Sequence, residues 1–191
     1  GGFLTKVLGM LIKIITTRII GTETLGLYML IMPTFNLFIT LAQGGLPISV
    51  SKIVSENKKD NKKIVFSSIF ISICTIFFLM ILLIFISPLI AKFLYIDSLS
   101  FPIMCIGLTL PFISLSGIIR GYFFGKENMF PHVLSNNFEQ VVRIILNIIF
   151  LPLLSNYEPR VSVTFLILSN VISETTSIII LYFFLPRKIK V

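Results

Sequence analysis

Six long apolar stretches divide this chain, and each is long enough to cross a membrane. A hydrocarbon core of about 30 Å requires roughly 20 apolar residues in a helix. Helices are expected rather than barrel strands, because the alternating apolar and polar pattern of such strands is absent and lipid-exposed backbone must pair within its own segment. The predicted helices cover residues 3–20, 27–51, 64–91, 99–122, 132–154 and 161–185.

Composition agrees with a membrane protein. Of 191 residues, 55% are hydrophobic and only 13% are charged, well below the share in soluble domains. Short polar runs at residues 21–26 and 55–63 are expected to separate the first three helices. No linker or second domain is visible, so the predicted fold is an all-α integral membrane protein with one six-helix lobe over residues 1–191.

Lysine and arginine are distributed unequally between the two sets of connections. Ten fall at the second and fourth connections and the C-terminal end, and three fall at the opposite connections. The positive-inside rule therefore predicts that both ends of the chain are cytoplasmic. The ten are Lys52, Lys58, Lys59, Lys62, Lys63, Arg120, Lys126, Arg187, Lys188 and Lys190, and the three are Arg18, Lys92 and Arg160. Topology thus accounts for most of the net charge of +8, and nucleic acid is not expected as a partner.

Polar residues inside four of the predicted helices recur at intervals of three and four, which places them on one face of each helix. We expect these faces to surround a shared wet cavity, with the third helix and much of the fourth turned to lipid or packing. The candidate site residues on these faces are Lys6, Lys13, Asn36, Gln43, Glu139, Arg143 and Glu174.

Structural interpretations compete with a binding role. Lys6 is close enough to the cytoplasmic end to extend its amine to the headgroups, and Glu139 and Arg143 are spaced to form an internal pair. Glu174 has no partner on its own helix, so Lys13 or Arg143 is the expected neighbour. Asn36 and Gln43 are of the residue types that hydrogen-bond neighbouring helices.

Other side chains with reactive chemistry are assigned no function. The positive-inside rule accounts for Arg120 at the cytoplasmic end of its helix, and His132 is expected at the membrane interface. Cys74 and Cys105 lie within predicted helices and are interpreted as packing residues. Because neither a metal-ligand cluster nor a nucleophile paired with a base is present, we expect no metal, no cofactor and no enzymatic activity.

Several segments resemble the stage V sporulation protein B family, which belongs to the multidrug/oligosaccharidyl-lipid/polysaccharide flippase superfamily and is similar to the lipid II flippases. The segments are IIGTETLGLY at 19–28, GGLPISVSKIVSE at 44–56, RGYFFGKENMFP at 120–131 and EQVVR at 139–143. The resemblance covers essentially the whole chain. It implies two six-helix lobes around a central cavity, of which this chain is the N-terminal one, so the C-terminal lobe is an expected partner.

The resemblance also implies a function in sporulation or in cell-wall and polysaccharide biosynthesis at the bacterial cytoplasmic membrane. The expected activity is movement of an anionic lipid-linked oligosaccharide, or another polyprenyl-pyrophosphate precursor, across the bilayer. Lys6 and Lys13 stand in the helix whose positive residues are thought to meet pyrophosphate in lipid II flippases. The carboxylate that accompanies the deeper basic position there has no match in this chain.

Two alternatives to a flippase remain open. A cation-coupled multidrug exporter of the same superfamily would have carboxylates dominating its cavity, whereas here three deep cations face Glu139 and Glu174. A non-transporting membrane scaffold would have a dry and fully paired interior. A coupling ion is a further possible partner of either transporter.

Overall fold

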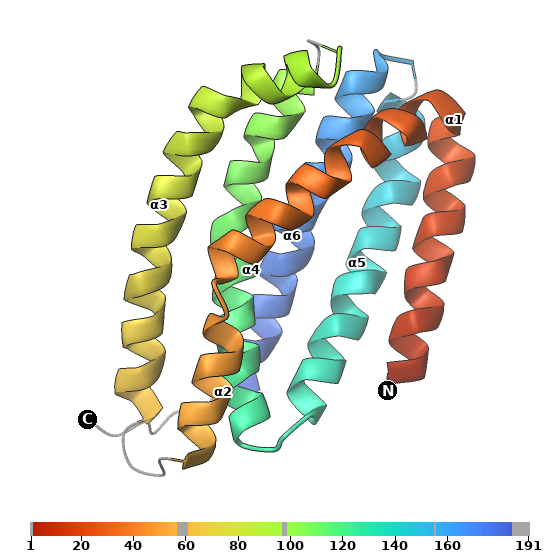
Figure 1. Ribbon diagram of the computed structural model, residues 1–191. Coiled ribbons are helices and arrows are strands. Elements are labelled where there is room, and N and C mark those ends of the chain that lie inside the picture. Colours follow the sequence, from red (N-terminus) through yellow and green to blue (C-terminus); the bar gives the residue numbers. More distant parts are fainter. Residues whose placement is uncertain (1, 57–60, 97–98, 155, 185–191) are drawn as a thin grey trace.

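A computed structural model describes residues 2–56, 61–96, 99–154 and 156–184 of the chain. Six helices follow one another, and Figure 1 shows them side by side in one bundle. They are α1 (Gly2–Gln43), α2 (Leu46–Glu56), α3 (Asn61–Phe93), α4 (Ser100–Gly125), α5 (Phe130–Leu154) and α6 (Pro159–Phe184). The predicted all-helical membrane class is confirmed.

The first predicted helix, 3–20, ends as expected before a break at Gly21, but the predicted connection over residues 21–26 is too long. Residues 22–26 are helical, so the chain turns at Gly21 alone and the second arm of α1 begins five residues earlier than predicted. Gly21 has φ 77° and ψ 177°, a conformation that glycine adopts without the strain a Cβ would cause. Figure 1 shows α1 rising from the N-terminus, bending at the top of the view and descending toward α2.

The second predicted helix, 27–51, is also interrupted. Gly44 and Gly45 have φ of 52° and 74°, so the helix stops at Gln43 and α2 begins at Leu46. Pro47 then occupies the first turn of α2, where its missing N–H breaks no helical hydrogen bond. Breaks and prolines of this kind are tolerated in membrane bundles where neighbouring helices satisfy the freed backbone groups.

Counted as continuous helical segments, five in the described part of the chain are long and apolar enough to span a membrane, one fewer than predicted. The difference arises because Gly2–Glu56 counts as one segment although α1 bends back at Gly21. Some predicted features lie outside the described residues: the connection at 97–98 between the third and fourth predicted helices, the predicted end at residue 185, and the cations Lys58, Lys59, Arg187, Lys188 and Lys190.

Helix α4 is the centre of the bundle. It packs against α2, α3 and α6, whereas α5 packs against α6 and α1. The main apolar core joins the descending arm of α1 to α3, α4 and α6 through side chains such as Phe35, Leu83, Ile106 and Ile167. By contrast α3 exposes a row of phenylalanines, including Phe70, Phe77 and Phe85, as expected of a lipid-facing helix. The expectation that the third and fourth helices serve lipid contact and packing is therefore met.

Small residues let α4 and α2 approach closely. A Cβ at Gly125 would lie 2.6 Å from the carbonyl oxygen of Ser51, and one at Gly121 would overlap the backbone of Pro47. Glycines spaced four apart commonly form such close contacts between membrane helices. Helix α2 therefore lies so close to α4 that no residue larger than glycine fits at Gly121 or Gly125.

We predict that Gly121→Ala destabilises the protein by about 1–3 kcal/mol, because the added methyl forces α2 away from α4. The measurement is the midpoint of thermal unfolding in detergent. Gly26→Ala is the matched control: nothing lies within 4 Å of its Cβ position, so helix propensity makes it neutral or stabilising. Equal midpoints for Gly121→Ala and Gly26→Ala would contradict the close α2–α4 packing.

Candidate functional site

A half-open cavity of about 910 Å³ lies between the two arms of α1, α5 and α6. Its size lies in the range of cavities that hold small molecules or ligand headgroups. Its wall combines apolar and polar residues from both arms of α1 with mostly polar residues from α5 and α6. The polar lining residues are Lys13, Thr16, Thr17, Tyr28, Asn36, Gln140, Arg143, Asn147, Ser169 and Asn170.

The charged residues in the lining are both cations. Lys13 comes from the rising arm of α1, and Arg143 comes from the middle of α5. On α1, Gly9, Lys13 and Thr17 share the cavity face because they are spaced four apart. No carboxylate belongs to the lining that the structure describes, so the charges that line the cavity are positive: Lys13, and Arg143, which is also paired with Glu139 behind the wall. Such a setting favours an anionic ligand.

Amide side chains make up much of the remaining polar surface. Asn147 donates through Nδ2 to Thr16 Oγ1 at 3.0 Å and so connects α5 to the rising arm of α1. Asn147 Oδ1 and Gln140 Oε1 are buried without a hydrogen-bond partner. Asn36, a predicted site residue, lines the opposite wall. Amides both donate and accept hydrogen bonds, which suits hydroxyl-bearing groups.

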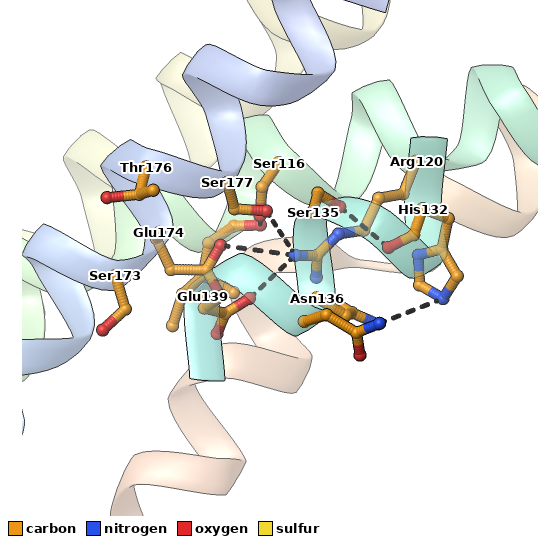
Figure 2. A network of polar contacts seen from close by, with 12 residues as sticks. Ser116, Arg120, His132, Ser135, Asn136, Glu139, Ser173, Glu174, Thr176 and Ser177 are labelled. Carbon is orange, nitrogen blue, oxygen red and sulfur yellow. Dashed lines mark hydrogen bonds and ion pairs between the residues drawn. The ribbon is translucent and has the colours of Figure 1, made fainter. Parts of the chain in front are cut away.

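Next to the cavity, a network of ion pairs connects α5 to α4 and α6. Figure 2 shows its centre, where Arg120 points toward Glu139 and Glu174. Arg120 Nη2 donates to Glu139 Oε2 at 2.9 Å and to Ser177 Oγ at 2.6 Å. Arg143 Nη2 donates to Glu139 Oε1, also at 2.9 Å, so the internal pair expected on α5 is present. Each oxygen of Glu139 is thus bonded to a different guanidinium, and Glu139 faces the interior rather than the cavity.

The predicted partner of Glu174 is wrong. Its nearest cation is Arg120, whose Nη2 lies 4.0 Å from Glu174 Oε2, rather than Lys13 or Arg143. The positive-inside rule alone does not explain Arg120, because its side chain is largely buried and connects α4 to α5 and α6. One sequence signal was available: Arg120 lies between Gly117 and Gly121, on the part of α4 that packs closely against its neighbours.

The structure brings together only some of the predicted residues. Lys13, Asn36 and Arg143 meet at the cavity, and Glu139 and Glu174 meet in the ion-pair network. Lys6 is exposed near the start of α1 and does not line the cavity. Gln43 ends α1 and packs against Gly117 of α4, so its amide supports the helix interface.

Comparisons with known proteins point to one family. The family model described as "Polysaccharide biosynthesis protein" matches residues 1–191. Three relatives from Bacillus subtilis (strain 168) are similar to the chain. Stage V sporulation protein B is 34% identical over 188 residues, covering 95% of this chain and 36% of the relative. Sporulation protein YkvU is 28% identical over 189 residues, with coverage of 94% and 40%.

The third relative is the lipid II flippase MurJ, which is 27% identical over 159 residues, covering 76% of this chain and 29% of the relative. The chain therefore spans between 29% and 40% of the length of these relatives. No solved structure matches it significantly. The predicted resemblance to stage V sporulation protein B is confirmed, and because the family model matches along residues 1–191, the chain belongs to the polysaccharide biosynthesis protein family.

Proposed function

We propose that this chain is one lobe of a flippase that moves an anionic lipid-linked oligosaccharide, or a related peptidoglycan or polysaccharide precursor, across the cytoplasmic membrane. The observation that carries the proposal is the cavity in which Lys13 and Arg143 are the charged lining residues. The relative MurJ is named a lipid II flippase, which supports a transport function rather than an enzymatic one.

The proposed mechanism is alternating access between two lobes. A second lobe of the same protein closes the open side of the cavity, and the two lobes rock to expose it to either side of the membrane. The lipid tail of the substrate remains in the bilayer while only the polar headgroup enters. Lysine suits this task because its ammonium is a mobile point charge that follows a diphosphate without holding it in one geometry.

The proposed orientation places the start of α1 and the end of α6 in the cytoplasm. Both lie at one end of the bundle, together with the ends of α2 and α4 (Figure 1). Lys6 of α1, Lys52 of α2, Lys62 and Lys63 of α3 and Lys126 after α4 belong to the same end. The opposite end carries fewer cations: Arg18 just before the break at Gly21, Lys92 in the last turn of α3 and Arg160 in the first turn of α6. This asymmetry supports the positive-inside assignment.

Replacing Lys13 is expected to weaken headgroup binding. Lys13→Ala removes a charge-assisted contact, and because such contacts contribute about 1.5–3 kcal/mol, affinity for a polyprenyl-diphosphate sugar falls about 10- to 100-fold. The measurement is equilibrium binding to the full-length protein in detergent. Lys92→Ala, which removes an exposed lysine far from the cavity, is the matched control and leaves binding unchanged. Unchanged binding in well-folded Lys13→Ala would refute the assignment.

Substrate charge separates the flippase from a multidrug exporter. Because Glu139 and Glu174 do not line the cavity, we expect the reconstituted full-length protein to translocate a lipid-linked sugar and to leave a cationic dye untransported. Both are measured in the same vesicles. Dye transport without movement of the lipid-linked sugar would favour the exporter instead.

Orientation is testable with single cysteines. Starting from a variant with Cys74 and Cys105 replaced by alanine, we expect a membrane-impermeant maleimide added to intact cells to label Tyr157→Cys and not Met129→Cys. These exposed residues lie in the α5–α6 and α4–α5 connections, at opposite ends of the bundle. Labelling of both after permeabilisation is the control, and the reverse pattern in intact cells would overturn the assignment.

A further inference from the structure

A continuous series of charged contacts leads from the cavity wall to a buried carboxylate. Arg143 lines the cavity and donates a hydrogen bond to Glu139. Arg120 donates to the other oxygen of Glu139 and lies beside Glu174 (Figure 2). The series contains two guanidinium groups and two carboxylates. With both carboxylates ionised its net charge is zero, so Arg143 is fully compensated from the side facing away from the cavity.

The two carboxylates are held very differently. Glu139 accepts a 2.9 Å hydrogen bond on each oxygen, whereas Glu174 Oε2 is buried with no hydrogen-bond partner and lies 4.0 Å from Arg120 Nη2. Only 9% of the Glu174 side chain is exposed. An ionised carboxylate in such a position lacks both water and strong hydrogen bonds, and both losses disfavour the charged form.

Charged and polar groups from two neighbouring helices surround the Glu174 carboxylate. Helix α4 contributes Arg120 and the Ser116 hydroxyl, and α5 contributes Glu139 and Arg143. Arg120 also donates to Ser177, which lies on the same helix as Glu174. Among these groups Glu174 is the carboxylate with an unbonded oxygen, so it is the group in the network best placed to accept a proton.

We propose that Glu174 is a proton-binding site linked to anion binding at Arg143, so that binding of either ligand favours binding of the other. The proposal rests on the proposed function, because it requires an anionic headgroup in the cavity. A headgroup that approaches Arg143 competes with Glu139 and adds negative charge to a neutral network. One proton transferred from water to Glu174 Oε2 restores the balance, and no other covalent bond is broken.

The linkage has a defined direction. Thermodynamic reciprocity requires that an anion which favours the protonated Glu174 binds more tightly where Glu174 is protonated. Affinity is therefore higher at low pH and is lost as pH rises. Because one proton is linked to each anion, the change is at most about tenfold per pH unit.

The experiment measures binding of a polyprenyl-diphosphate monosaccharide to the full-length protein from mildly acidic to mildly alkaline pH. This probe is a diphosphate diester and keeps its charge throughout the range. We expect wild-type affinity to fall with pH and Glu174→Gln to bind with pH-independent affinity. Glu158→Gln, which changes an exposed carboxylate in the α5–α6 connection, is the matched control and keeps the wild-type pH dependence. His132→Gln is expected to keep it too, which separates Glu174 from the one histidine near Arg120 and Glu139.

Each outcome bears on the proposal. Wild-type affinity that is independent of pH, or a pH dependence that persists in Glu174→Gln or disappears in His132→Gln, overturns the linkage while leaving the flippase assignment intact. Absence of binding at every pH overturns both. If Glu174→Gln does not fold, proton uptake by the wild-type protein in weakly buffered solution decides. Up to one proton per bound anion supports the linkage, and none refutes it.

Discussion

The contact between Arg120 and Glu139 is the interaction on which the interior of this bundle depends. A charged side chain within the apolar layer is costly unless it finds a partner, and here one guanidinium from α4 meets the carboxylate of α5 while also donating to Ser177 of α6. Glu139 is thereby compensated from two sides. Arg143 consequently remains part of the cavity wall and is not withdrawn into the interior by an unpaired carboxylate.

Glycines allow the close helix contact and the bend on which the rest of the bundle depends. At Gly121 and Gly125 the absence of a Cβ allows α2 to lie against α4, and at Gly21 a positive φ lets α1 turn back and form two walls of the cavity. The cavity therefore results from two local conditions, a reversal of α1 and a firmly packed α4 behind it. In the proposed rocking motion, this lobe moves as a unit and the cations on α1 and α5 move with it.

Sequence periodicity predicted part of the cavity wall, because a helix places residues three and four apart on the same face. Lys13, Asn36 and Arg143 were found this way, as was the internal pair of Glu139 with Arg143. Lys6 and Gln43 lie on the predicted polar faces but do not line the cavity, and Gln43 packs against Gly117 of α4 instead. Periodicity gave no sign of the Arg120 contacts, because the positive-inside rule already explained a cation near a helix end.

The membrane class, the helical content and the presence of polar faces were determined by sequence alone, since hydropathy and helical period are local properties of a chain. Which helix stands opposite which polar face was decided only by tertiary packing. The partner of Glu174 is the clearest example, because it lies 54 positions away on α4 and is set by how α4 and α6 pack, information that no local pattern contains.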